Sequence, residues 1–328
     1  MTDIINPSDE WDESRIDIVG QNGNEGLHYE KNDELIVKKP KILVTGVTGY
    51  IGSHVSRVLF ERGWDVIGLD INSHQNDISA YVSRFVHWDI RDAQFFEQYD
   101  AVVHLAGLIS VEESMTNPTE YYSTNLLGTA QVLRQMDRNT HLIFASTAGA
   151  FDPQSPYARS KIAAEDIIKE QANNYTIFRF FNVAGSDGDN MQQGNATHLI
   201  RIAAECAVGT RDKMSIFGHD YDTGDGTCIR DYVHVVDLAN AIANAIEKGP
   251  KNTPYECIGS GTGYTVKEVI RMMKRVSGVD FEVVDSPRRA GDPAVLIINN
   301  RFDGLEINYT LEDMCRSAWQ VELKRGVL

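Results

Sequence analysis

The sequence predicts an α/β protein whose core is a doubly wound parallel sheet, followed by a smaller C-terminal lobe. Short apolar segments alternate with amphipathic helical segments from residue 39 onward. A glycine-rich turn follows the first apolar segment, and after about Asn182 the alternation loosens into loops rich in glycine and aspartate. We therefore expect residues 39–182 to form the sheet domain and residues 183–328 to form mainly the second lobe, with residues 233–250 returning to the first.

The predicted strands and helices follow from the local residue pattern. We expect the first strand within residues 39–46, because this apolar run ends in Thr and Gly as a buried parallel strand should. Further short apolar runs predict strands at 66–69, 84–87, 101–105, 141–146 and 176–181. Amphipathic stretches predict helices at 53–62, 119–136 and 156–173. Such βαβ alternation implies a sheet covered on both faces, with ligands at the carboxyl ends of the strands.

Composition excludes several classes of protein. The formal net charge is −16, which argues against binding to the phosphate backbone of nucleic acid. No apolar run reaches the roughly 18 residues of a membrane span, and the N-terminus is acidic where a signal peptide would be basic, so we expect no membrane association and a cytoplasmic location. The four scattered cysteines form no CxxC pair, so we expect reduced thiols and no metal site.

Residues 1–38 are acidic and contain few large apolar residues. This composition predicts a flexible, solvated extension, with a docking or cap role as the alternative.

The glycine-rich turn has the spacing and context of a dinucleotide-binding motif. Gly46, Gly49 and Gly52 follow the first strand and open a helix, so a pyrophosphate could sit at the free N–H groups of the helix N-terminus. Asp70 ends the next predicted strand about 20 residues on, where a carboxylate binds an adenosine ribose. This carboxylate would repel a 2′-phosphate. We therefore predict a Rossmann-type site for NAD rather than NADP.

Two other strand ends carry residues that could lie near the dinucleotide. Asp89 follows one strand, and His104 with Leu105, Ala106 and Gly107 ends another. In this fold such positions lie beside the adenine ring and the pyrophosphate. For His104 we favour a structural role.

A tyrosine and a lysine lie four residues apart at the start of a predicted helix. Ser155 and Pro156 supply a capping hydroxyl and a first-position proline, and Tyr157 and Lys161 then share one helix face. A phenol with a pKa of about 10 is a poor base, but a nearby ammonium group, a nicotinamide cation and a helix N-terminus would each lower that pKa. Thr147 ends the preceding strand and could share the substrate proton. We predict Tyr157, Lys161 and Thr147 as the catalytic residues.

Taken together, these motifs resemble the extended short-chain dehydrogenase/reductase family and, within it, the UDP-glucose 4-epimerases. The resemblance covers about residues 39–320. Its most specific segments are TGVTGYIG (45–52), HLAGLISVEES (104–114), YYSTNLLGT (121–129), SPYARSK (155–161), FRFFNVAG (178–185), IFGHDYDTGDGTCIRDYVHVVDL (216–238) and PRRAGDPA (287–294).

The resemblance implies an NAD-dependent epimerisation at C4 of a UDP-hexose through a 4-keto intermediate, with the smaller lobe binding the substrate. Within the motifs it implies NAD contacts at Tyr50, Ile51, Asn72, Ile90, Leu105, Ala106, Gly107, Asn125, Tyr157, Lys161 and Phe181. It implies contacts to the nucleotide sugar at Thr147, Tyr157, Asn182, His198, Leu199, Phe217, Arg230, Arg289 and Asp292. Guanidinium groups suit a diphosphate, which agrees with the two arginines in an acidic protein.

Two alternatives are distinguishable. A nucleotide-sugar 4,6-dehydratase or decarboxylase shares the first oxidation, but its water elimination needs an acid soon after the catalytic Thr, and Thr147 is followed here by Ala-Gly-Ala. A catalytically silent NAD-binding sensor is disfavoured by the presence of Thr147, Tyr157 and Lys161.

The chain departs from similar proteins at three places. Five residues separate Phe151 from Tyr157, where relatives have a longer loop that frames the sugar, and Ile109 stands where many have a phosphate-contacting Lys. Leu296 occupies the position that sizes the sugar pocket, and its intermediate bulk leaves hexoses and N-acetylhexosamines both open. The helices at 119–136 and 156–173 resemble those of a four-helix dimer interface, which predicts a homodimer.

Overall fold

A seven-stranded parallel sheet forms the centre of the protein. The computed structural model describes residues 39–73, 76–94, 97–190, 196–289 and 292–327. In that part of the chain the strand order is β10-β6-β5-β4-β1-β2-β3. The strands are β1 (Lys41–Thr45), β2 (Asp65–Asp70), β3 (Arg84–His87), β4 (Ala101–His104), β5 (His141–Thr147), β6 (Tyr175–Phe180) and β10 (Glu256–Ile258). This arrangement confirms the predicted doubly wound fold.

The strand order reverses between β1 and β4, which pair side by side in parallel with Thr45 opposite His104. Such a switch point opens a crevice at the carboxyl ends of the strands, where ligands bind. The glycine turn after β1, the residues after β4 and Thr147 at the end of β5 all lie at this edge. The fold therefore gathers the predicted site residues of the first domain at one end of the sheet.

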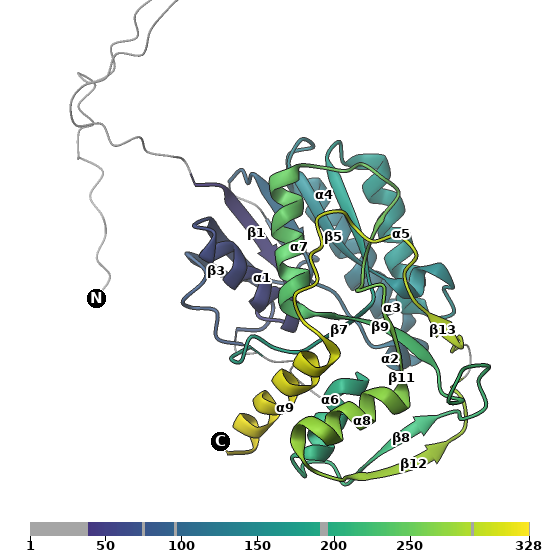
Figure 1. Ribbon diagram of the computed structural model, residues 1–328. Coiled ribbons are helices and arrows are strands. Elements are labelled where there is room, and N and C mark those ends of the chain that lie inside the picture. Colours follow the sequence, from purple (N-terminus) through teal and green to yellow (C-terminus); the bar gives the residue numbers. More distant parts are fainter. Residues whose placement is uncertain (1–38, 74–75, 95–96, 191–195, 290–291, 328) are drawn as a thin grey trace, which may run out of the picture. The chain divides into compact units, whose positions relative to one another are not determined.

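Helices cover both faces of the sheet (Figure 1). Helices α1 (Tyr50–Glu61) and α7 (Val235–Lys248) pack on one face with Ile42, Val44 and Phe178. Helices α4 (Gly128–Gln135) and α5 (Pro156–Gln171) pack on the other with Leu43 and Phe144. Because both faces are covered, the strands are apolar throughout instead of alternating.

The helix predicted at 119–136 is interrupted. It consists of α3 (Pro118–Tyr122), a π-helical turn at Ser123–Leu127 and α4, and the short α2 (Val111–Thr116) precedes it. A π-turn places one extra residue in the helix, a feature frequent at functional sites. Here it contains Asn125.

The remaining elements build a second core. Strands β7 (Asn182–Ala184), β9 (Ile229–His234), β11 (Gly263–Thr265) and β13 (Val295–Leu296) form a small sheet, and β8 (Lys213–Phe217) pairs with β12 (Glu282–Ser286). Helices α6 (Leu199–Ala207), α8 (Val266–Ser277) and α9 (Leu311–Val327) pack against one another next to these strands (Figure 1). Ile200, Met273 and Met314 belong to their common apolar core.

Strand β10 was not predicted. Its three residues pair with β6 as the edge of the large sheet, so this strand comes from a part of the chain expected in the second lobe. None of the helices in the described ranges is long and apolar enough to span a membrane.

Candidate active site

The glycine turn after β1 is closed too tightly for side chains. Gly46 has φ of +72°, and a Cβ there would lie 2.8 Å from the Ala106 backbone nitrogen. A Cβ on Gly52 would lie 2.1 Å from the Gly46 carbonyl oxygen. Only glycine fits both positions, because the helix after the turn and the backbone that follows β4 approach the turn at backbone distance. Leu105 and Ala106, from the end of β4, form the wall against which the turn packs.

The residues around this turn fit a dinucleotide. Gly49 is the N-cap of α1 without a side-chain cap hydrogen bond, and the first turn of α1 carries no acidic residue. This leaves the positive end of the helix, at Tyr50, Ile51 and Gly52, free of protein anions, as a pyrophosphate requires. Asp70, at the end of β2, accepts hydrogen bonds from the Thr48 and Asn72 backbone N–H groups, both at 3.0 Å. The carboxylate is thereby held beside the turn.

Two other sequence-predicted residues have protein partners. Asp89 accepts from the Arg91 guanidinium, with a shortest distance of 2.6 Å, and this bond lowers the pKa of the carboxyl group. Ile90 next to it is buried. His104 lies between the Thr45 and Thr129 hydroxyls at 2.7 and 3.0 Å, and burial together with the Lys161 charge lowers its pKa to about 3. Both ring nitrogens of His104 are therefore occupied by protein hydroxyls, which favours the predicted structural role.

Thr147, Tyr157 and Lys161 are brought together at the end of β5. The predicted cap is present, since the Ser155 hydroxyl accepts from the Ala158 N–H at the start of α5. The Thr147 side chain is the neighbour of Tyr157 that favours its ionised form and so acts to lower the pKa of the phenol. Lys161 is buried, and its ammonium group donates to the Ala145 carbonyl oxygen at 2.9 Å.

The protein groups around Tyr157 raise the pKa of its phenol, and Lys161 does not lower it as predicted. Burial raises this pKa, and only the hydrogen bond with Thr147 acts in the opposite direction. Burial also lowers the pKa of Lys161 to about 8, against the opposing charge of Glu165. The phenol therefore needs a further positive charge nearby before it can serve as a base near neutral pH.

Asn125 in the π-turn ties this site to the end of β4. Its side chain accepts from the Leu108 N–H at 2.8 Å and donates to the Leu108 carbonyl and the Ser160 hydroxyl, both at 3.0 Å. A Cβ on Gly107 would lie 2.8 Å from the Asn125 amide oxygen and 3.3 Å from the Lys161 nitrogen. Gly107, Asn125 and Lys161 therefore adjoin.

An apolar cluster joins the catalytic end of β5 to the second lobe. Ala148, which follows Thr147, packs with Phe181 and Ile298, and Leu296 lies against the same cluster. Phe181, a predicted cofactor contact, thus lies next to Leu296, the predicted sugar-pocket residue.

Four of the residues predicted to contact the nucleotide sugar form two pairs in the second lobe. The Arg230 guanidinium, in β9, donates to Asp292 at 3.0 Å. Arg289 stacks over the Phe217 ring, with its central carbon 4.0 Å from the ring centroid. Asn182 begins β7, opposite Tyr232 in β9. The structure thus pairs Arg230 with Asp292 and Arg289 with Phe217.

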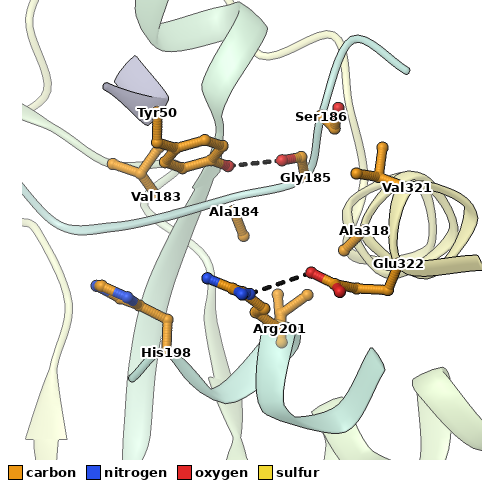
Figure 2. A pocket seen from close by; sticks show the side chains of 11 residues that line it. Tyr50, Val183, Ala184, Gly185, Ser186, His198, Arg201, Ala318, Val321 and Glu322 are labelled. Atoms are coloured by element: carbon orange, nitrogen blue, oxygen red, sulfur yellow. Dashed lines mark hydrogen bonds and ion pairs between the residues drawn. The ribbon is translucent and has the colours of Figure 1, made fainter. Parts of the chain in front are cut away.

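His198 and Leu199 lie at the start of α6, where His198 lines a pocket (Figure 2). Tyr50 lines the same pocket and donates to the Gly185 carbonyl oxygen at 2.6 Å. On the opposite side Arg201 donates to Glu322 at 3.1 Å. Burial, with the Arg201 charge, lowers the pKa of His198. Tyr50, a predicted cofactor contact, and His198, a predicted substrate contact, therefore line the same pocket.

A buried ion pair between α5 and β6 was not predicted from the sequence. Glu165 is bound by Arg179 of β6 at 2.7 and 2.9 Å, and both side chains are buried. Glu165 continues the four-residue spacing of Tyr157 and Lys161, and this continuation was a signal available in the sequence.

Three features of the structure define a dinucleotide-dependent enzyme of the short-chain dehydrogenase/reductase type. They are the doubly wound fold, the glycine turn suited to a dinucleotide, and the strand-end hydroxyl next to a helix that carries a tyrosine and a lysine. The model of the NAD dependent epimerase/dehydratase family matches residues 42–257. The chain belongs to this family, and NAD is its cofactor.

Similar proteins include UDP-glucose 4-epimerases from distant organisms. That of Halalkalibacterium halodurans is 37% identical over 317 residues, which cover 85% of this chain and 94% of the relative. The Homo sapiens enzyme is 33% identical, covering 85% of this chain and 95% of the relative. The structure of the Bifidobacterium longum UDP-glucose 4-epimerase, solved with NAD+ and UDP, matches with a TM-score of 0.79 at 30% identity over 87% of this chain and 99% of its own.

Proposed function

We propose that this protein interconverts UDP-hexoses by inverting the configuration at C4, through a 4-keto sugar. The observation that carries the proposal is the position of Thr147, at the carboxyl end of β5, beside Tyr157 and Lys161 of α5 and at the same edge of the sheet as the glycine turn. The similarity to UDP-glucose 4-epimerases over most of the chain supports it.

In the proposed site NAD is held along the switch point of the sheet. Gly46, Gly49 and Gly52 admit the pyrophosphate, and Asp70 binds the adenosine ribose. Ile51, Asn72, Asp89, Ile90 and Phe181 are the other contacts that we propose. When bound, NAD would supply the hydride acceptor and donor that inversion at the sugar C4 requires.

Tyr157 is the proposed base that accepts the proton of the sugar 4-hydroxyl, while Thr147 donates to the phenol oxygen and stabilises its ionised form. Lys161 adds positive charge to the same enclosed site. Arg230 and Arg289 hold the diphosphate, so that the hexose can turn over while the nucleotide stays bound. Asp292, paired with Arg230, orients that guanidinium group.

The pocket at the start of α6 supports a substrate role for His198, and Leu199 follows it in the chain. Its lining includes Val183 and Ala184, which follow Asn182 in β7. We propose that the sugar nucleotide lies along this strand toward His198, with Phe217 and Leu296 bounding the uracil and sugar ends.

Product analysis tests the proposal. The purified protein is incubated with UDP-glucose, UDP-galactose, their N-acetyl forms and UDP-glucuronate, and products are identified by proton NMR. We expect C4 inversion of at least one of them. Tyr157→Phe should lower turnover by about 10²- to 10⁴-fold, the usual contribution of general acid–base catalysis, while NAD binding persists. A wild-type protein that inverts none of the five, or full turnover by Tyr157→Phe, would reject the assignment.

We further propose a homodimer formed by the α3–α4 segment and α5, in the cytoplasm. Leu127 in this segment and Met115 in α2 are each 60% exposed and offer apolar side chains that a partner could cover. Light scattering at micromolar concentration should give twice the mass of one chain. Leu127→Glu should halve it, whereas a monomeric wild-type mass would reject the dimer.

A further inference from the structure

Glu165 lies on the same face of α5 as Tyr157 and Lys161, and it is bound to side chains of β5 and β6. Tyr157, Lys161 and Glu165 follow each other at four-residue intervals, so all three lie on the face of α5 that meets β5. The three β5 residues they contact are consecutive. Tyr157 bonds to the Thr147 side chain, Lys161 donates to the Ala145 carbonyl oxygen at 2.9 Å, and Glu165 accepts from the Ser146 hydroxyl at 2.5 Å. The strand and the helix are thus fixed to each other at three successive points.

The Glu165 carboxylate is itself held from two sides. Arg179 donates to both of its oxygens, at 2.9 and 2.7 Å, and the Lys169 nitrogen lies 3.5 Å away. Only 1% of Glu165 is exposed. A carboxylate so buried and bonded from two sides is fixed in place.

Aromatic rings hold the arginine in turn. The central carbon of its guanidinium group lies 3.9 Å from the centroid of the Tyr255 ring and 4.9 Å from that of Phe151. Phe151 ends the 3-10 turn that begins directly after Thr147. The same arginine therefore contacts the catalytic helix through Glu165 and the turn after the catalytic threonine through Phe151.

Lys161 needs a counter-charge because its ammonium group is buried. Only 3% of the residue is exposed, and the groups it contacts directly are the Ala145 carbonyl and the Phe144 ring, 4.8 Å from the ammonium nitrogen. Both contacts favour a cation but carry no negative charge. Burial disfavours the charged form of the amine, and Glu165, one helical turn away, opposes this effect.

The other titratable groups around Lys161 and Glu165 do not supply a negative charge. His104 of β4 is neutral, and Tyr157 of α5 and Cys257 of β10 have their pKa values raised by burial. Arg179 of β6 and Lys169 of α5 are cations beside Glu165. Among the described groups packed against this site, Glu165 is the carboxylate one helical turn from Lys161 whose charge acts on it.

We propose that Glu165 is a positioning residue for the reaction, which keeps Lys161 charged beside Tyr157 and is itself locked in place by Arg179 and Ser146. The catalytic meaning of this role rests on the proposed function, whereas the effect on Lys161 is a property of the folded chain.

A lysine titration tests the effect without turnover. Protein labelled with ¹⁵N-lysine is titrated with pH, and the side-chain nitrogen of Lys161 is followed by NMR, assigned by its loss in Lys161→Arg. In Glu165→Gln we expect Lys161 to lose its proton roughly one pH unit lower than in the wild type, the smallest effect usual for a close opposite charge. Asp166→Asn removes the same charge from an exposed neighbour and should leave the titration unchanged.

Turnover gives a second readout. Glu165→Gln should lower kcat with little change in KM, and the alkaline limb of its kcat profile should move to lower pH with the Lys161 titration. Glu165→Asp, which keeps the charge, should restore most of the limb's position. If Glu165→Gln does not fold, the double variant Glu165→Gln/Arg179→Met removes the whole pair and should show the same downward shift.

An unchanged Lys161 titration in a folded variant without the carboxylate would overturn the proposal, as would an equal shift in Asp166→Asn. A wild-type protein that turns over no UDP-hexose would instead contradict the proposed function and leave the titration readable.

Discussion

The hydroxyl of Thr147 acts both on the turn that follows it and on the predicted catalytic phenol. Its hydroxyl accepts from the Gly149 N–H at 3.1 Å, which caps the following turn, and its bond with Tyr157 lowers the pKa of the phenol against the effect of burial. A base must lose its proton before it can act. Loss of the threonine hydroxyl should therefore move the onset of activity to higher pH.

The first prediction follows from this direction of the pKa change. Thr147→Val should shift the acid limb of the kcat profile upward and lower kcat at pH 7 by about tenfold to a hundredfold, the value of one or two hydrogen bonds to a charged group. Thr147→Ser keeps the hydroxyl and should retain the wild-type limb. An unshifted limb in the valine variant would show that Thr147 does not act on Tyr157.

The role proposed for Arg230 in binding the diphosphate can be tested with a matched control arginine. Its guanidinium is 12% exposed and is oriented by Asp292, whereas Arg288, in the same lobe, is 44% exposed and bonds to Asp220. We predict that Arg230→Ala raises KM for the UDP-sugar by about tenfold to a hundredfold, because a charge-assisted bond to the diphosphate is lost. The matched variant Arg288→Ala should change KM less than twofold. Steady-state kinetics separates the two, and equal effects would count against the diphosphate site.

At the scale of the elements, the sequence pattern predicted the large sheet better than the second lobe. Buried parallel strands are short apolar runs, and β3 was predicted with its observed bounds, Arg84–His87. The three-residue β10 was missed, because so short a segment carries no period of its own and is selected by pairing with β6. Tertiary pairing, not local preference, decides such an edge strand.

The candidate site shows a similar division. Gly46, Gly52 and Ser155 could be predicted, because a tight turn and a helix start demand particular residue types. The bond from Lys161 to Ala145 could not, because it depends on how far α5 slides along β5. Arg179 was missed for the same reason, since its partners lie on three other elements.

The π-turn is the element that an experiment can probe most directly. Asn125 is 1% exposed and makes three hydrogen bonds, two to Leu108 and one to Ser160. We predict that Asn125→Ala lowers the free energy of unfolding by about 1–3 kcal/mol, because it leaves buried partners unsatisfied. Asn139→Ala, at an exposed turn, should cost less than about 0.5 kcal/mol. Urea unfolding measures both, and a similar cost for the two would mean that Asn125 does not clamp the loop.

On the scale of the whole molecule, buried neutral histidines couple stability to pH. Burial lowers the pKa of His141 from 6.5 to about 4, and the ring is bonded to the Thr176 hydroxyl at 2.9 Å. His234 behaves alike, with a pKa lowered to about 4, and caps α7 through its ring nitrogen. Between pH 6.5 and 4 these histidines therefore bind protons in the unfolded chain but not in the folded chain.

Because these folded-state pKa values are depressed, their contribution to stability is complete above pH 6.5 and is lost progressively as the pH falls toward 4. We predict that the free energy of unfolding falls steeply over this window. His141→Gln, which can keep a bond to Thr176, should remove up to about 3 kcal/mol of that fall, whereas Gln at the exposed His219 should leave the slope unchanged. Urea unfolding at half-unit pH intervals measures the slope. A His141→Gln slope equal to that of the wild type would mean that His141 is not a source of the acid sensitivity, and that carboxylates such as Asp187, whose pKa is lowered by its bond with His54, set it instead.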